Sequence, residues 1–151
     1  MTEQPIIRLA TAGDIPAIVR LLADDHLGAA REDLSIPESY NRAFEAVQAQ
    51  PGNGIYVMEV EGRVVGTMQL VVIAGLSQQG TRRMEIEAVR VDSSLRSKGL
   101  GETLIRWAIE CAREDGCGMV QLMSHKSRDG AHRFYSRLGF ANSHEGFKLQ
   151  L

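Results

Sequence analysis

The segment with the clearest chemical potential is a glycine-rich turn, Arg96-Ser97-Lys98-Gly99-Leu100-Gly101, between a strand-like run and a helix-like run. At the start of a helix the first backbone N–H groups have no partner within the helix and lie at the positive end of its dipole. Glycines allow that backbone to approach an anion closely. The turn therefore predicts a phosphate-type anion site, although a Gly-Leu-Gly at a helix start also suits simple turn formation.

Two carboxylates, Glu85 and Glu87, lie on the strand that leads into this turn. Because side chains alternate along a strand, residues two apart share a face. A carboxylate in that position can take a proton from a substrate ammonium group, directly or through water. An exposed strand face with paired charges explains the two glutamates equally well, so the residues alone leave both interpretations open.

Two familiar phosphate-binding motifs do not fit the turn. A Walker A loop requires Lys followed by Ser or Thr after its last glycine, whereas Gly101 is followed by Glu102. The dinucleotide fingerprint requires a third glycine, where Leu104 stands instead. The nature of the anion must therefore come from other parts of the chain.

The elements expected to position these residues are strands and helices in mixed order. Apolar residues recur with strand or helix periods, and Gly, Pro or Asp marks the turns between them. Glu61-Gly62-Arg63 suits an antiparallel hairpin, whereas the late elements form a strand-helix-strand unit. We predict a single α+β (mixed α/β) domain over residues 1–151. Strands are expected at 6–10, 55–60, 64–73, 84–91 and 119–124, with one or two more in 140–151, and helices at about 15–22, 38–50, 99–114 and 129–138.

Local signals refine three of these boundaries. Asp14 is predicted to cap the first helix at its N-terminus, and Gly139 to end the last helix. Residues 24–37 break the helical period and predict an irregular joint. On the helix from about Gly99, an apolar stripe is expected to face the core and charged residues to lie outside it.

The overall composition argues against several classes of partner. The 151 residues carry a formal net charge of −2, which gives no reason to expect a nucleic acid or an anionic membrane. No apolar stretch approaches the roughly 20 residues of a membrane-spanning helix, and no signal peptide is evident. Cys111 and Cys117 lack the spacing of a metal site, so we expect no metal and a cytoplasmic protein with reduced thiols.

The sequence resembles the GNAT superfamily of N-acetyltransferases. Arg96 to Gly101 meets the family motif R/Q-x-x-G-x-G/A, and Ala131 to Phe140 resembles the A-x-x-F-Y-x-x-x-G-F signature. The N-terminal Ile7-Arg8-Leu9-Ala10 with Asp14 is similar to a typical opening of the family. The resemblance spans nearly the whole chain and implies the GNAT fold, a central mixed and twisted sheet with helices on both faces.

The resemblance also implies roles for individual residues. Acetyl-CoA would be the co-substrate, with its pyrophosphate on the main-chain N–H groups of the turn and its pantetheine arm paired with the backbone of the preceding strand. Tyr135 would give a proton to the leaving sulfur, unless it is only a packed helical aromatic, and Glu87 is preferred over Glu85 or water as the base. The expected cofactor-binding residues are Val89, Arg90, Val91, Arg96, Ser97, Lys98, Gly99, Leu100, Gly101 and Glu102.

The acceptor is expected to be the primary amine of a small molecule. Residues 128–135 and Ser143-His144 resemble the aminoalkylphosphonate N-acetyltransferases within the family. One departure is Arg128, because many members carry an asparagine there, which puts a side-chain amide contact to coenzyme A in doubt. Protein or peptide acetylation, a non-catalytic acyl-CoA-binding module and a structural interaction domain remain alternatives. Homodimers are common in the superfamily, so the resemblance also allows a homodimer.

Overall fold

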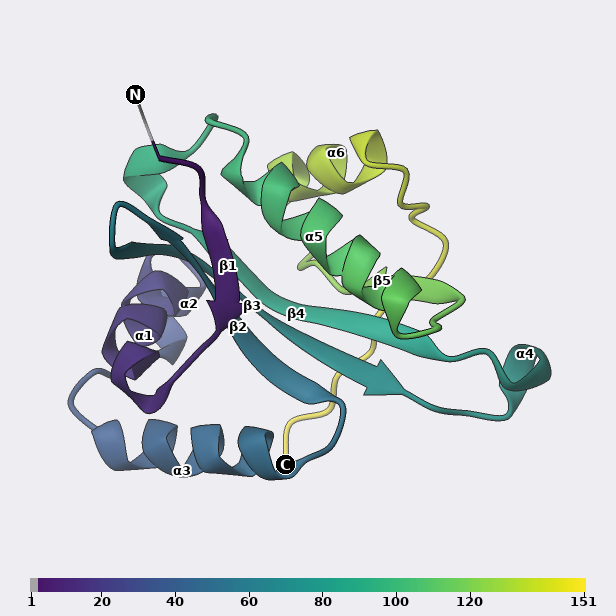
Figure 1. Ribbon diagram of the computed structural model, residues 1–151, viewed down its shortest axis with the longest axis horizontal. Helices are drawn as coiled ribbons and strands as arrows, with labels where there is room; N and C mark the ends of the chain where they lie inside the picture. Colours follow the sequence, from purple (N-terminus) through teal and green to yellow (C-terminus); the bar gives the residue numbers. More distant parts are fainter. Residues whose placement is uncertain (1–2) are drawn as a thin grey trace.

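The computed structural model describes residues 3–151, and five strands in it form one sheet in the order β1-β2-β3-β4-β5 (Figure 1). Strands β1 to β4 pair with one another in antiparallel fashion, and β5 runs parallel to β4. The strands are β1 (Ile6–Leu9), β2 (Asn53–Val60), β3 (Arg63–Ile73), β4 (Arg83–Val91) and β5 (Met119–Leu122). The α-helices are α1 (Ile15–Ala23), α2 (Gly28–Arg31), α3 (Pro37–Ala49), α4 (Ser77–Gly80), α5 (Leu100–Glu114) and α6 (Asp129–Arg137), with short 3-10 turns at Ala12–Asp14 and Ser93–Leu95.

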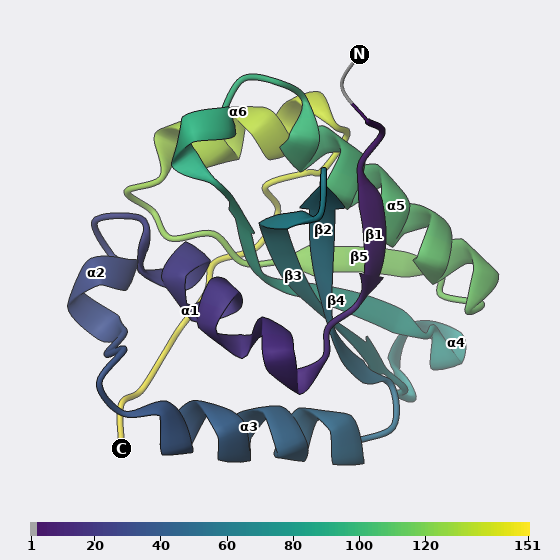
Figure 2. The same cartoon turned by 60° about the vertical axis from the view of Figure 1, so that its left-hand side comes forward.

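Helices cover both faces of this sheet, as predicted. Helices α1, α2 and α3 lie on one side, and α5 and α6 on the other (Figures 1 and 2). Successive side chains of β2 point to opposite faces of the sheet, so the core has two parts. Val57 packs with α1 and α3, while Met58 packs with α5. Both side chains are fully buried. The structure therefore confirms the predicted mixed α/β class.

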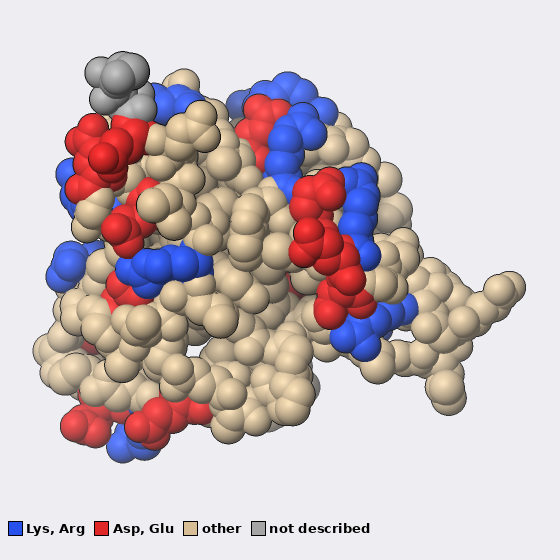
Figure 3. All heavy atoms as spheres, viewed as in Figure 1, with Lys and Arg blue, Asp and Glu red and all other residues tan. Residues whose placement is uncertain are grey.

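Helix α5 has the expected amphipathic form. Its buried residues are Leu104, Ile105, Ala108 and Ala112, at helical spacing. The outer face carries charges of both signs (Figure 3), including the ion pairs of Arg106 with Glu102 and of Arg113 with Glu110. The apolar stripe fixes the rotation of the helix, and its rotation fixes where the glycine-rich turn lies.

The hairpin between β2 and β3 turns through two residues. Glu61 and Gly62 both have positive φ values, 51° and 75°, as a type I′ turn requires. Val60 then pairs with Arg63, which confirms the antiparallel hairpin expected from these residues.

Strand β4 contains a bulge at Ala88. On the partner strand, Thr67 pairs with Arg90 but Gln69 pairs with Glu87, so β4 has one extra residue there. Ala88 takes a φ of 53°, the left-handed conformation that non-glycine residues rarely adopt. The extra residue reverses the alternation beyond it. Met84 and Ile86 lie in the α5 core before the bulge, and after it the odd-numbered Val89 and Val91 pack there instead.

Strand β5 accompanies β4 for only part of its length. The parallel pairing runs from Arg83 with Met119 to Ile86 with Leu122. Strand β4 continues to Val91, so within residues 3–151 its last five residues have no strand on the β5 side. This opening of the sheet ends beside the glycine-rich turn.

The structure differs from the sequence-based expectations in three places. No strand is present in the tail from 140 to 151, where an extra one or two were predicted, because its backbone meets no other strand in the described chain. The joint at 24–37 contains the short helix α2. Asp14 occupies the N-cap position of α1, as predicted, but its carboxylate makes no capping hydrogen bond to that helix and instead accepts hydrogen bonds from the Thr11 N–H and from Arg8. Gly139 does end α6, with a φ of 98°.

No helix of residues 3–151 is both long enough and apolar enough to cross a membrane.

Candidate functional site

The glycine-rich turn presents free backbone donors at the start of α5. The first hydrogen bond of this helix runs from the Thr103 N–H to the Gly99 carbonyl at 3.1 Å, so the N–H groups just before Thr103 have no acceptor within the helix. Ser97 and Gly99 both have positive φ, 67° and 78°. Successive turns of this kind aim N–H groups into one concavity that suits an anion. The geometry fits the phosphate-type site expected from the sequence.

The preceding turn is held by side chains from elsewhere in the chain. Asp92 accepts from the Ser94 N–H at 2.9 Å and from Arg63 at 2.6 Å. Asp24, at the end of α1, accepts from the Ser93 N–H at 3.2 Å. Arg96 is exposed and donates to the Asp24 carbonyl at 3.5 Å. The glycine-rich turn and the residues just before it are thereby tied to the joint between α1 and α2.

The free edge of β4 ends at this turn. Val89, Arg90 and Val91 lie in the part of β4 that β5 does not accompany. Their backbone groups on that side are available to an extended ligand that adds itself as a strand. The side chains of Val89 and Val91 pack on the core, so the backbone is what these two residues offer to a ligand.

Tyr135 lies on α6 with its ring packed between two aromatic rings. The ring centroids are 5.1 Å from Phe134 and 5.8 Å from Phe140, both in edge-to-face contact. Burial raises the pKa of Tyr135, while the charges of Arg90 and Arg128 lower it by less. The hydroxyl is therefore protonated at neutral pH, the form that a general acid requires.

Glu85 and Glu87 differ in their surroundings although they share a face of β4. Glu85 accepts a hydrogen bond from the Gln121 side chain at 2.5 Å, and Gln121 accepts one from Arg83. Partial burial raises the pKa of Glu87, as does the neighbouring Glu85, while Lys148 lowers it. A carboxyl group with a raised pKa is the better base for an ammonium proton near neutral pH. This difference favours Glu87 over Glu85.

The structure reveals an ionic cluster that the sequence interpretation missed. Asp25 Oδ2 lies 3.0 Å from Arg90 Nε and 3.1 Å from Arg128 Nη1. Burial raises the pKa of Asp25, but the Gly28 N–H and the two arginines lower it more, to about 2. Arg90 was expected to act through its backbone alone. Its side chain turns toward the α1–α2 joint because the Ala88 bulge reverses the alternation of β4.

Gly28 places Asp25 in this cluster. The Gly28 N–H donates to Asp25 Oδ1 at 2.5 Å. A Cβ atom at Gly28 would lie 1.8 Å from the Leu22 carbonyl oxygen, so only glycine fits this position. The presence of a glycine in this joint was the sequence signal that could have pointed to such close packing.

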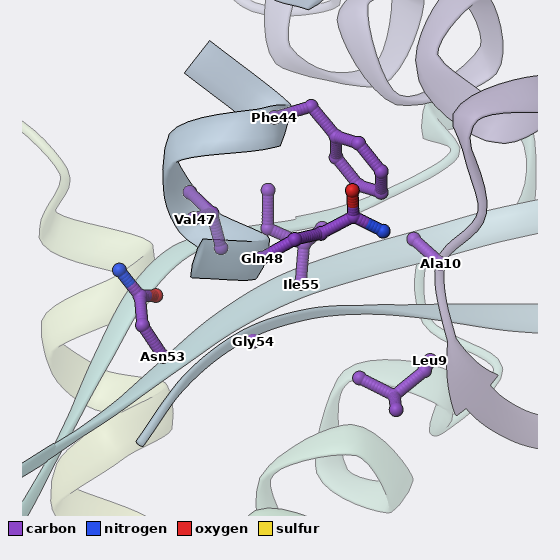
Figure 4. A pocket seen from close by; sticks show the side chains of 8 residues that line it. All are labelled: Leu9, Ala10, Phe44, Val47, Gln48, Asn53, Gly54 and Ile55. Carbon is purple, nitrogen blue, oxygen red and sulfur yellow. The ribbon is translucent and has the colours of Figure 1, made fainter. Parts of the chain in front are cut away.

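Two hollows lie away from the glycine-rich turn. One of about 270 Å³ separates the C-terminal half of α3 from the start of β2, and no ionisable side chain lines it (Figure 4). Its polar side chains are Gln48 and Asn53. It lacks the acids, bases and cations that acyl transfer needs. Among residues 3–151, no group of three or more His, Cys, Asp or Glu is placed to hold a metal ion.

Comparisons with known proteins point to one family of enzymes. A sequence model described as the acetyltransferase (GNAT) family matches residues 15–140. An uncharacterised N-acetyltransferase of Escherichia coli, YjgM, is 31% identical over 144 residues, covering 91% of this chain and 83% of the relative. The aminoalkylphosphonate N-acetyltransferase of Salmonella typhimurium is 37% identical over 67 residues, 44% of each chain. For several other curated relatives the match spans only 39% to 43% of their length.

A solved structure also shares the whole architecture. A protein from Bacillus halodurans C-125, named as a transcriptional regulator, superposes with a TM-score of 0.93 at 42% identity, over 98% of this chain and 100% of that one.

Proposed function

We propose that this chain, which belongs to the GNAT acetyltransferase family and is therefore an acetyl-CoA-dependent N-acetyltransferase, acts on the primary amine of a small molecule. The observation that supports acetyl transfer is the combination of three features: free N–H groups at the start of α5, the unaccompanied end of β4, and the protonated hydroxyl of Tyr135. We further propose that all residues 1–151 act as one such domain.

In the proposed site the donor is held by main-chain groups. The N–H groups from Ser97 to Glu102 bind the pyrophosphate of coenzyme A, with Arg96 and Lys98 adding positive charge. The backbone of Val89 to Val91 pairs with the pantetheine arm. This arrangement leads the thioester along β4 from the turn toward the face that carries Glu87.

Acetyl transfer then proceeds by direct attack. Glu87, directly or through a water, takes a proton from the substrate ammonium, and the amine nitrogen forms a bond to the acetyl carbonyl carbon. The carbon–sulfur bond breaks, and the sulfur takes the Tyr135 proton. The acetylated nitrogen gives up its second proton, which restores Tyr135. The products are the N-acetyl amine, coenzyme A thiol and one released proton.

The experiment is an acceptor screen with acetyl-CoA, in which free thiol and product mass are measured. Small amines, lysine-containing peptides and peptides with free N-termini form three arms. The similarity to an aminoalkylphosphonate N-acetyltransferase supports the small-molecule arm. Turnover confined to the peptides would overturn the small-molecule proposal in favour of protein acetylation. A longer acyl-CoA in a parallel arm tests the choice of acetyl.

A second candidate is a non-catalytic module that binds acyl-CoA. It draws support from the similar structure named as a transcriptional regulator. Its signature is a melting temperature raised by coenzyme A without thiol release on any amine. Thiol release that depends on Tyr135 rules it out.

We also infer a homodimer formed through the C-terminal tail. Residues 141–151 are all exposed, and Phe147 and Leu149 expose 90% and 85% of their surface. These two and Leu151 alternate, so an extended tail carries them on one face. Exposed apolar faces of this kind favour a protein partner, and because homodimers are common in the superfamily we take a second copy of this chain as that partner. The free thiols of Cys111 and Cys117 support a cytoplasmic location.

A further inference from the structure

We propose that Arg90 and Arg128 form an anion-binding subsite for the acceptor, so that the preferred amine carries a carboxylate, phosphate or phosphonate group. The inference rests on the proposed N-acetyltransferase function and adds the chemical class of the acceptor. It follows from the excess of positive charge in the cluster, from its unused donors and from its position.

The cluster holds two cations and one anion in partly buried surroundings. The side chains of Arg90 and Arg128 are 17% and 23% exposed, and that of Asp25 is 9% exposed. A single oxygen, Oδ2, faces both guanidinium groups, because Oδ1 accepts from the Gly28 N–H. Arg31 adds a further positive charge nearby. Excess charge away from water is unfavourable unless another anion completes the cluster.

Within residues 3–151, most donors of the two guanidinium groups make no hydrogen bond. Arg90 Nη1 donates to the Val89 carbonyl at 2.9 Å, and Arg128 Nη1 donates to Asp25 at 3.1 Å. Arg90 Nε is fully buried and makes no hydrogen bond with any described residue, although it lies 3.0 Å from Asp25 Oδ2. Each guanidinium carries five N–H donors in a planar fork that suits carboxylate or phosphate oxygens. The pair is therefore prepared for an additional oxyanion.

The position of the cluster connects it with the reacting groups. Arg90 follows Glu87 on β4, and the bulge at Ala88 sets both side chains on the face away from the α5 core. Both arginines are close enough to Tyr135 for their charges to act on its pKa. An acceptor that places its amine at Glu87 and Tyr135 can therefore reach the arginines with an anionic group a few bonds away.

Two other roles for the cluster predict different behaviour. As a purely structural brace between the α1–α2 joint, β4 and α6, it would affect stability but not the choice of acceptor. As a site for a phosphate of coenzyme A, it would affect the KM for acetyl-CoA but not the choice of acceptor. Both alternatives can be separated from the proposal by measuring acceptor preference.

The test compares matched acceptors on the intact protein. 2-Aminoethylphosphonate and β-alanine are set against propylamine and β-alaninamide, which resemble them without the anionic group. We expect kcat/KM to be about 10-fold to 100-fold higher for the anionic members, the range of a charge-assisted hydrogen-bond pair. In Arg128→Gln this preference falls by about the same factor, and Arg128→Lys retains part of it. Arg133→Gln, which removes the same charge from the exposed face of α6, keeps the preference.

Each outcome decides a separate claim. Equal kcat/KM for anionic and neutral amines overturns the subsite and leaves the acetyltransferase function intact. A preference unchanged in Arg128→Gln, with a raised KM for acetyl-CoA or only a lower melting temperature, overturns it in favour of one of the two other roles. If no amine causes thiol release from acetyl-CoA, the proposed function fails. The subsite is then tested by calorimetric titration of the protein with 2-aminoethylphosphonate in the presence of coenzyme A. Binding that Arg128→Gln weakens supports the subsite, and the absence of binding overturns it.

Discussion

Asp25 and Arg128 lie 103 residues apart in the chain, and their side chains meet at 3.1 Å. This contact joins the α1–α2 joint to the start of α6. Asp24, the neighbour of Asp25, binds the turn that precedes α5. The two adjacent aspartates therefore hold both the turn that precedes α5 and the helix of Tyr135 in place relative to α1.

Removal of the Tyr135 hydroxyl tests the acid step. We expect Tyr135→Phe to lower kcat by about 100-fold or more, the usual contribution of a general acid, with little change in the KM for acetyl-CoA. The ring packing with Phe134 and Phe140 is kept, so the melting temperature should stay near that of the parent. Thiol release at saturating substrate is the measurement, and full turnover in this variant would exclude Tyr135 as the acid.

The pH dependence of kcat/KM tests Glu87. A base acts only when it is deprotonated, so activity falls as the pH drops through its pKa. Because burial and Glu85 raise the pKa of Glu87, the inflection is expected above that of an exposed glutamate. Glu85→Gln removes one of these causes and should move the inflection to lower pH. Glu87→Gln should abolish the Glu87 inflection, and a profile that is unchanged in both variants would point to water as the base.

Substitution of Gly28 tests the position of Asp25. The Cβ atom of Gly28→Ala would overlap the Leu22 carbonyl oxygen, and we expect a loss of more than about 2 kcal/mol in the free energy of unfolding. At Gly13 the nearest atom to an added Cβ is 3.7 Å away, so Gly13→Ala should change stability by less than about 0.5 kcal/mol. Urea unfolding measures both, and equal stabilities would contradict the steric argument.

Asp14 should contribute to stability against acid. Its hydrogen bonds to Arg8 lower the pKa of Asp14 from 3.8 to about 2. A carboxyl group whose pKa is lowered by folding stabilises the protein above its unfolded pKa, and that contribution is lost as the pH falls. The free energy of unfolding should therefore drop between about pH 4 and pH 2, and Asp14→Asn should flatten this region. The same charge change in Glu45→Gln, on the exposed side of α3, serves as the control.

The exposed apolar face of the C-terminal tail leads us to predict a homodimer that forms as the protein concentration rises. Phe147→Asp with Leu149→Asp places charges on the apolar face of the tail, and we expect light scattering to show a dimer converted to a monomer. Gln150→Asp adds a charge at the alternate position and should leave the dimer in place. A parent protein that is monomeric at high micromolar concentration would refute the homodimer.

The sequence could predict the elements because each depends on local patterns. The stripe on α5 and the Glu61-Gly62 turn follow from helix period and turn chemistry, and both are present. The Ala88 bulge could not be predicted, because alanine has no preference for a positive φ and the bulge depends on pairing with β3. The ionic cluster on Asp25 depends in turn on that bulge and on a contact across 103 residues.

The tail shows the opposite failure. Its alternating apolar residues are typical of a strand, yet a strand requires backbone hydrogen bonds to a neighbouring strand, and residues 140–151 form no such ladder in the described chain. The alternation is a valid local signal for a strand. A strand also requires a tertiary contact, namely pairing with a neighbouring strand, and local sequence does not determine that contact.

The unaccompanied end of β4 also bears on how the protein survives in solution. Unpaired strand edges are templates on which other chains can add themselves, and so they promote aggregation. A pantetheine arm lying along Val89 to Val91 would occupy the same hydrogen-bonding groups. Acetyl-CoA would then protect this edge as an added strand. The protein would aggregate more slowly when its own substrate is abundant.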